Sequence, residues 1–205
     1  MMVKGLRAKR ARERAIGIAL LVPAAPVLAG AAAAIWIESR LNRKARGPVL
    51  FREQRIAEGR VIELLKFRTL DAAALASLGE GPTHIATLER EGRMTRSGRL
   101  VKQWYLDELP QLWNIARGDI GLVGTRPYPI ELYEAELAAG ITRKRDMPSG
   151  LIGPVQSRKG TTMDALALDQ EYWDACRTLS SWRLAVLDLR ITLRSARVLL
   201  QHKGI

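Results

Sequence analysis

The sequence contains very little cysteine and histidine. Its 205 residues include one cysteine, Cys176, and two histidines, His84 and His202. A single cysteine excludes an intramolecular disulfide framework and a zinc site built on several cysteines. Two histidines also exclude a His-rich metal centre. We therefore interpret Cys176 and His84 as structural residues. The sequence has no internal repeat and no low-complexity linker.

Acidic residues are outnumbered by basic ones, and the excess is uneven along the chain. The 33 Lys and Arg residues against 21 Asp and Glu residues give a net charge of +12. Residues 1–46 account for +8 of this charge. Such a protein is expected to bind anionic partners, which include nucleic acids, phosphorylated metabolites and membrane surfaces. Apolar residues make up 47% of the chain, which is enough to build a core.

An uncharged segment of 23 residues, 15–37, separates two basic clusters near the N-terminus. As a straight helix it would be about 35 Å long, enough to cross the hydrocarbon core of a bilayer. Four interpretations remain open: a cleaved signal peptide, a buried helix, a single-span anchor and a re-entrant hairpin. Basic residues on both sides favour a hairpin with both ends in the cytoplasm. Pro23 and Pro26, near the middle, favour a break in the helix.

The rest of the sequence predicts an α+β fold that is mainly helical and contains one small β-hairpin. Segments 49–56 and 60–68 are typical of two strands joined by a short loop with Gly59. In the second strand, Lys66 and Arg68 are expected to project from the same face. The other predicted elements are a short helix within 71–91, helical segments at 93–116 and 129–139, a Gly-rich turn at 118–125, a Pro/Gly-rich loop at 147–160 and a helix over about the last 35 residues.

The predicted C-terminal helix carries two adjacent stripes at helical spacing. One stripe is apolar (Trp182, Val186, Leu189, Leu193 and Leu200), and the other is basic (Arg183, Arg190, Arg194 and Arg197). Core packing is one interpretation of the apolar stripe. The other is an amphipathic interfacial helix with arginines at lipid phosphates.

Two kinds of side chain suggest chemistry on phosphates. Asp107 and Glu108 are adjacent; they are either an ordinary acid pair at a helix start or a dyad whose carboxylates serve different partners. Arg126 follows a glycine-rich turn, and guanidinium groups bind phosphate in a bidentate fork. Each cation, taken alone, is also compatible with a solvated surface charge. Together, carboxylates and cations suit phosphoryl transfer, in which charge stabilisation and positioning dominate.

Several blocks of the sequence resemble the bacterial sugar transferases, the monotopic phosphoglycosyl transferases that start glycan assembly on a polyprenol carrier. The blocks are GPVLFREQR, LLKFRTL, TRSGR, LDELPQLWNIARGDIGLVGTRP and GLIGPVQSRKG. The resemblance covers about residues 15–200. In this chain Trp104 and Tyr105 stand where small hydroxyl residues are usual, and Thr125 replaces a proline.

The resemblance implies a reaction and a role for each site residue. A phosphosugar passes from a nucleotide sugar, expected to be a UDP-sugar, to polyprenyl phosphate, with release of UMP. Asp107 is implied as the nucleophile that forms a covalent phosphosugar intermediate, and Glu108 as a ligand of Mg²⁺. Lys66, Arg68 and Arg126 are implied as contacts of the diphosphate. Gln156 and Arg158 are implied to line the nucleotide site.

The same resemblance implies a location and a domain division. Residues 1–46 are expected to form a re-entrant helix-hairpin in the bacterial inner membrane, broken at proline. Residues 47–205 are expected to form the catalytic domain on the cytoplasmic face, in contact with membrane lipids and without a nucleic-acid partner. A membrane-tethered nucleic-acid-binding protein and an inactive scaffold of the same fold are the alternatives. The oligomeric state stays open, with a homodimer among the alternatives.

Overall fold

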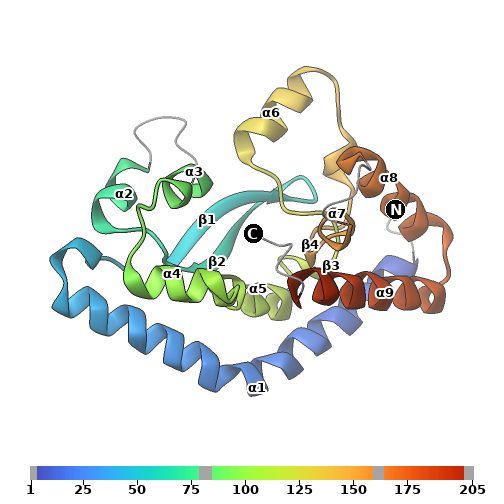
Figure 1. The fold of residues 1–205 in the computed structure, drawn as a ribbon. Helices are drawn as coiled ribbons and strands as arrows, with labels where there is room; N and C mark the ends of the chain where they lie inside the picture. Colours follow the sequence, from blue (N-terminus) through green and yellow to red (C-terminus); the bar gives the residue numbers. More distant parts are fainter. Residues whose placement is uncertain (1–3, 79–84, 159–163, 201–205) are drawn as a thin grey trace. The chain divides into compact units, whose positions relative to one another are not determined.

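The computed structural model describes residues 4–78, 85–158 and 164–200, and they form two compact units (Figure 1). The dyad unit, named for the Asp107–Glu108 pair, comprises Leu20–Glu53 and Leu64–Trp113. The C-terminal unit comprises Met1–Ala19, Gln54–Glu63 and Asn114–Ile205. The predicted mainly helical fold with a small β-hairpin is confirmed. The predicted division at residue 46 concerns contact with a membrane and stays a prediction.

The N-terminal segment forms one helix, α1 (Lys4–Leu41), of 38 residues. It is followed by the short helix η1 (Arg43–Ala45). Helical backbone continues through Pro23 and Pro26, so the expected interruption of the helix is not seen. Each proline removes one backbone hydrogen bond, which a long helix tolerates when the remaining turns are intact. A re-entrant course of the chain stays a prediction.

Helix α1 has the length and composition of a membrane-crossing helix over Gly5–Leu41. A core helix of a soluble protein has the same composition but is mostly buried. In α1 only 11% of the most apolar 18-residue window is buried. The interpretation of this segment as a buried soluble helix is therefore wrong.

The predicted β-hairpin is confirmed to within one residue at each strand end. It consists of β1 (Leu50–Ala57) and β2 (Arg60–Phe67). Glu58 and Gly59 join the strands with φ angles of 52° and 73°. Positive φ at both central residues is the geometry of type I′ turns, whose twist matches that of the flanking strands.

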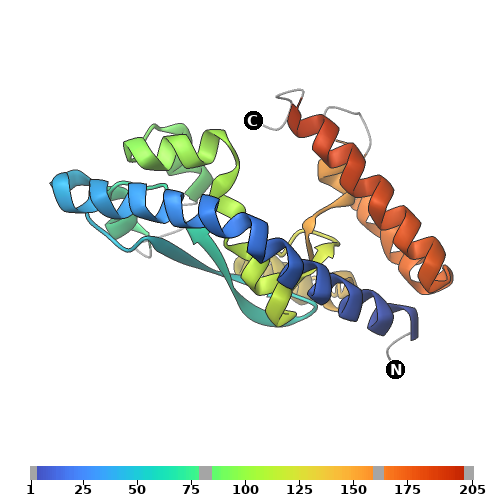
Figure 2. The same cartoon turned by 90° about the horizontal axis from the view of Figure 1, so that it is seen from below.

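The dyad unit is built around the second half of α1. Ala31 and Ile35 of α1 pack against Phe67 of β2 and Val101 of α4 (Arg96–Gln103), and α4 lies beside α1 (Figure 2). Leu100 and Trp104, at the end of the same helical segment, are 55% and 66% exposed. The remaining elements of this unit are α2 (Ala72–Ser77), α3 (Ile85–Arg90), η2 (Leu106–Glu108) and the start of α5 (Gln111–Arg117).

The C-terminal unit contains a two-stranded parallel sheet that the sequence pattern did not reveal. Strand β3 (Gly121–Val123) pairs with β4 (Gly150–Ile152), with Gly121 opposite Gly150. Next to these strands, the backbone segments that contain Gly124 and Pro148 approach closely. A Cβ atom on Gly124 would lie 2.5 Å from the carbonyl oxygen of Pro148. Glycine is therefore required at position 124. Between the strands lie α6 (Ile130–Ala138), as predicted, and η3 (Arg143–Arg145).

Three helices complete the C-terminal unit: α7 (Pro154–Ser157), α8 (Ala165–Thr178) and α9 (Ser181–Leu200). The prediction of one uninterrupted C-terminal helix is wrong, because α8 ends at Thr178 and α9 begins at Ser181. Helix α9 packs against the β3–β4 pair (Figure 1).

Cys176 is fully buried in this core, and burial raises the pKa of its thiol to about 12. His84 and His202 lie outside the described residues.

The face of α9 that enters the core is not the predicted one. Leu184, Asp188 and Ile191 are buried, whereas Trp182 is 76% exposed and Leu189 and Leu193 are also exposed. The core-packing interpretation of the Trp182 stripe is therefore wrong. Trp182, Leu189 and Leu193 lie on the exposed side of the helix with the four neighbouring arginines, whereas Val186 is half-buried.

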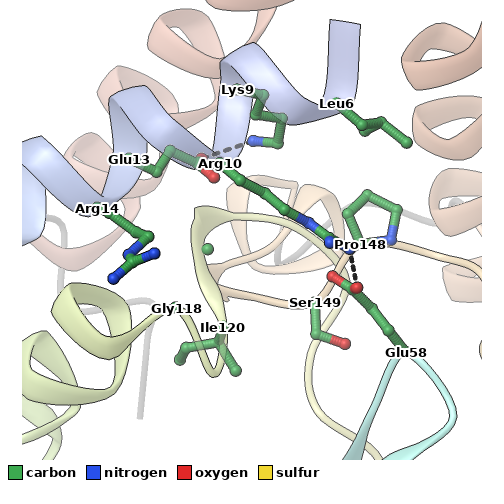
Figure 3. Close-up of a pocket in the computed structure, with 11 residues that line it drawn as sticks. Leu6, Lys9, Arg10, Glu13, Arg14, Glu58, Gly118, Ile120, Pro148 and Ser149 are labelled. Atoms are coloured by element: carbon green, nitrogen blue, oxygen red, sulfur yellow. Dashed lines mark hydrogen bonds and ion pairs between the residues drawn. The ribbon is translucent and has the colours of Figure 1, made fainter. Parts of the chain in front are cut away.

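Buried charges tie the first turns of α1 to the rest of the C-terminal unit. The ammonium group of Lys9 lies 2.6 Å from Glu13 Oε1 and 3.0 Å from Asp188 Oδ2. Glu13 Oε1 also accepts a hydrogen bond from the backbone N–H of Val123 at 2.9 Å. A small pocket beside this network is crossed by the ion pair of Arg10 with Glu58 (Figure 3). None of the predicted site residues lines that pocket.

Candidate active site

The acid pair lies in a tight turn between α4 and α5. Thr95 caps α4 at its start, where its hydroxyl accepts the N–H of Gly98 at 2.9 Å. The helix ends at Gln103. Two residues later the N–H of Tyr105 donates to the carbonyl of Lys102 at 3.0 Å, and the Tyr105 backbone is left-handed, with φ 55°. Helix η2 then carries Asp107. The helix-cap interpretation of Asp107 is wrong, because its carboxylate contacts a side chain and Tyr105 occupies the cap position.

The two carboxylate oxygens of Asp107 have different surroundings. The residue is 2% exposed, and Oδ2 accepts a hydrogen bond from the ammonium group of Lys102 at 3.3 Å. Oδ1 is buried and has no hydrogen-bond partner among the described residues. Burial raises the pKa of Asp107 above its usual value; Lys102 opposes the shift and the charge of Glu108 adds to it. The structure thus binds one carboxylate oxygen to Lys102 and leaves the other without a partner among the described residues.

Lys102 is a site residue that the sequence did not reveal. Its ammonium group lies 3.1 Å from Glu89 Oε2 as well as 3.3 Å from Asp107 Oδ2. Glu89 is itself fixed, because its Oε1 accepts a hydrogen bond from the hydroxyl of Thr69 at 2.8 Å. Burial disfavours the ammonium form, but Asp107 and Glu89 outweigh it and raise the pKa of Lys102. Lys102 is therefore a charged, oriented neighbour of the buried carboxylate.

Two further predicted residues belong to the surroundings of Asp107. Lys66 forms an ion pair with Glu53 at 2.8 Å, and its charge acts to lower the pKa of Asp107. Glu108 is half-buried beside Asp107.

Within the described residues, no three His, Cys, Asp or Glu side chains are grouped closely enough to hold a metal ion. Mg²⁺ at phosphate sites takes one or two carboxylates and completes its coordination with water and phosphate oxygens, and the acid pair fits that donor set.

Arg68 has surroundings that differ from those of Lys66. Its guanidinium group donates hydrogen bonds to the carbonyls of Pro48, Leu70 and Ala45, each at 2.7 Å. The residue is 1% exposed. The expectation that Lys66 and Arg68 project together is wrong, because β2 ends at Phe67 and Arg68 turns into the protein. Arg68 thus joins three backbone segments, and its predicted contact with a diphosphate stays a prediction.

Arg126, Gln156 and Arg158 belong to the C-terminal unit. Arg126 follows β3 and is exposed, whereas Gln156 and Arg158 follow β4 and are half-buried. Because parallel strands end at the same edge of a sheet, the three residues follow the same edge of the β3–β4 pair. Gln156 Oε1 accepts the N–H of Gly153 at 2.5 Å, which fixes the start of α7. Arg158 lies 3.9 Å from Glu171.

The buried Asp107 and its neighbours lie in blocks of sequence that are shared with known proteins. The profile of the family described as bacterial sugar transferase matches residues 4–202. The chain belongs to the bacterial sugar transferase family. The match includes α1, both units and every residue predicted for the site, so the family resemblance of the motifs is confirmed.

Three of the curated relatives that the chain matches are named as transferases of a sugar phosphate. UDP-glucose:undecaprenyl-phosphate glucose-1-phosphate transferase of Caulobacter vibrioides is 36% identical, covering 86% of this chain and 63% of its own. Undecaprenyl-phosphate glucose phosphotransferase of Komagataeibacter xylinus is 33% identical, covering 89% and 34%. UDP-N-acetylgalactosamine-undecaprenyl-phosphate N-acetylgalactosaminephosphotransferase of Aeromonas hydrophila is 27% identical, covering 87% and 40%. The chain thus spans between a third and two thirds of the length of these relatives.

Replacing Arg68 by Met separates the structural contacts of this arginine from its predicted contact with substrate. We expect the variant to lose about 3 kcal/mol or more of stability, because three buried carbonyls lose their donor. The measurement is the melting temperature in detergent. The variant Arg52→Met, also in the dyad unit, is the comparison for loss of an arginine charge. An R68M protein with unchanged melting temperature and weaker binding of nucleotide sugar would instead favour the substrate contact.

Proposed function

We propose that this chain transfers a phosphosugar from a UDP-sugar to polyprenyl phosphate and releases UMP. The observation that carries the proposal is the buried Asp107, with Oδ2 bound to Lys102 and Oδ1 without a partner among the described residues. It occurs in a chain of the bacterial sugar transferase family, whose relatives are named for UDP-sugars and undecaprenyl phosphate.

The first half of the proposed reaction forms a bond between Asp107 and phosphorus. Oδ1 attacks the phosphorus that bears the sugar, the bond from that phosphorus to the bridging oxygen breaks, and UMP leaves with the electron pair. Lys102 holds Oδ2, so the attacking oxygen has a fixed direction. The half-reaction consumes the carboxylate form of Asp107 and yields an acyl phosphate that carries the sugar.

The second half returns the carboxylate. A phosphate oxygen of the polyprenyl carrier attacks the same phosphorus, the bond to Oδ1 breaks, and the sugar leaves on a new diphosphate. The two half-reactions use one nucleophile in turn, so a soluble donor and a lipid acceptor need not be bound together. Lys102 remains beside Oδ2 in both half-reactions and stabilises the Asp107 carboxylate when it leaves the phosphorus.

Mg²⁺ is part of this proposal, with Glu108 as its carboxylate ligand. The bound ion supplies charge neutralisation on the diphosphate, which an anionic nucleophile requires. The cations proposed for the diphosphate are Lys66, which already acts on the charge of Asp107, and Arg126, which is exposed after β3. Gln156 and Arg158 are proposed for the nucleotide, since they follow β4 at the same edge as Arg126.

The proposed location is the cytoplasmic face of the bacterial inner membrane. Exposed apolar side chains of the dyad unit support it; they are Val22, Val27, Trp36, Ile37, Leu41, Leu100, Trp104 and Trp113. In the C-terminal unit, the exposed Trp182, Leu189 and Leu193 of α9 and the neighbouring arginines have the composition of an interfacial helix. Both units thus offer surfaces that suit contact with lipid, and we propose that α1 enters and leaves the membrane on one side.

Cysteines on either side of the apolar segment test the proposed topology. Arg7→Cys and Lys44→Cys place thiols at exposed positions, while the native Cys176 is fully buried and serves as an internal control. We expect a membrane-impermeant maleimide to label both new cysteines in inverted vesicles and neither in intact spheroplasts. Labelling of one of the two from the periplasmic side would establish a spanning helix.

The proposed reaction is tested by nucleotide release in detergent. The assay contains purified protein, Mg²⁺, polyprenyl phosphate and, in turn, UDP-glucose, UDP-galactose and UDP-N-acetylgalactosamine. We expect UMP to form with at least one donor, and turnover to require both lipid and Mg²⁺. Folded protein that releases UDP instead of UMP would contradict the proposal, since UDP release transfers the sugar without its phosphate.

A further inference from the structure

The backbone at Tyr105 adopts a conformation that tyrosine disfavours. Its φ and ψ are 55° and 20°, in the left-handed region where the Cβ atom crowds the following carbonyl. Glu58 is the other non-glycine residue with positive φ in the described part of the chain, and its hairpin turn explains it. At position 105 a glycine would end α4 without that steric cost. Tyrosine at position 105 therefore carries a steric cost that glycine would avoid.

The hydroxyl group of Tyr105 is also left without a partner. Its oxygen is buried and makes no hydrogen bond to any described residue. Two other atoms of the same turn share this state: Oδ1 of Asp107 and Nε2 of Gln111, which is 3% exposed. Unsatisfied buried polar atoms are rare and costly, and three within seven residues of one turn indicate that a ligand completes their hydrogen bonds.

The unpartnered groups at Tyr105 and Gln111 indicate the chemistry of the ligand. Burial raises the pKa of the Tyr105 hydroxyl, Lys102 opposes the shift, and Glu108 and Asp107 add to it. The hydroxyl is thus a neutral donor at physiological pH. A neutral O–H and an amide N–H beside a nucleophilic carboxylate oxygen match the non-bridging oxygens of a phosphoryl group.

We propose that Tyr105 is a further catalytic residue, whose hydroxyl donates a hydrogen bond to a non-bridging oxygen of the phosphoryl group while that group is bonded to Asp107. The inference rests on the proposed function. Tyr105 keeps its proton throughout, so the bonds that form and break are those of the Asp107 half-reaction alone. Gln111 supplies a second donor from the start of α5. The contact is strongest when negative charge gathers on the phosphoryl oxygens, so it acts on the rate more than on donor binding.

The test is the variant Tyr105→Phe, which removes one oxygen atom and keeps the ring. The measurement is the rate of UMP release in a single turnover without lipid acceptor, using the donor on which the wild type is most active. We expect a rate about 10- to 100-fold lower than that of the wild type, with KM for the donor changed less than about twofold. The melting temperature is expected to stay level or rise, because the variant removes an unpartnered buried hydroxyl.

Tyr128→Phe is the matched control. Its hydroxyl donates to Glu136 at 2.8 Å in the C-terminal unit, so this variant also loses one tyrosine hydroxyl. We expect its rate to stay within about twofold of the wild type. Two results with an active wild type would overturn the assignment of Tyr105 alone. One is an equal rate of UMP release in Tyr105→Phe and Tyr128→Phe. The other is a normal rate with a lower melting temperature in Tyr105→Phe. A wild type that releases no UMP would overturn the proposed function, and this assignment with it.

Discussion

Replacing Asp107 by Asn is expected to reduce turnover by about 10⁴-fold or more and to abolish the covalent intermediate. Asn keeps the shape of the side chain but has no anionic oxygen to attack phosphorus. The measurements are UMP release and the mass of the intact protein after incubation with donor. Near-normal activity in this variant would contradict the role of Asp107 as nucleophile.

The stability of the Asp107→Asn protein separates loss of chemistry from loss of fold. Burial raises the pKa of Asp107, so the folded state favours the protonated carboxyl and the ionised form destabilises it near neutral pH. Asn removes that ionised group, while Lys102 keeps its ion pair with Glu89. We therefore expect a melting temperature equal to or above that of the wild type. Asp174→Asn, on the exposed side of α8, is the control for loss of one carboxylate and should retain full activity.

Replacing Lys102 by Met is expected to slow formation of the intermediate by about 10²- to 10³-fold. The variant loses the group that orients Oδ2 of Asp107 at 3.3 Å and stabilises its charge. Because Lys102 opposes the rise in the pKa of Asp107, its removal raises that pKa further. The acid limb of the pH–rate profile should therefore move to higher pH, since the nucleophile must be ionised.

The position of the acid limb is measured from UMP release in single turnovers across the pH range. Lys66→Met is the comparison, since Lys66 acts on the pKa of Asp107 in the same direction but less strongly. We expect its acid limb to move by less than that of Lys102→Met. An acid limb that is unchanged or moves to lower pH in Lys102→Met would contradict the claim that the ion pair with Lys102 lowers the pKa of Asp107.

Local sequence patterns predicted the parts of the fold whose causes are local. The β-hairpin follows from alternating side chains around a glycine-containing turn, and α6 follows from a helical pattern after Pro129. The acid pair was identified by its motif, and the family match extends over its surroundings. The exposure of Trp182, Leu189 and Leu193 argues against core packing of that face of α9, and its contact with a membrane surface stays a prediction.

The turn that builds the site was not predictable from local pattern, because no glycine or proline marks its first residue. A continuous helix over 93–116 would place residues 102 and 107 about 140° apart on its surface. The left-handed backbone at Tyr105 reverses the chain, and Lys102 therefore reaches Asp107. The direction of the Arg68 side chain was mispredicted for a related reason, because alternation describes a strand and β2 ends one residue earlier. Strands β3 and β4 have three residues each, too few to show a period.

The central claim is that a phosphosugar becomes bonded to Asp107 before the acceptor binds. The most direct measurement is the amount of UMP released when the protein meets Mg²⁺ and an active UDP-sugar without polyprenyl phosphate. We predict a burst of about one UMP per active protein, together with a matching sugar-phosphate adduct on the peptide that contains Asp107. UMP that forms only after polyprenyl phosphate is added, with no adduct at any time, would contradict the account.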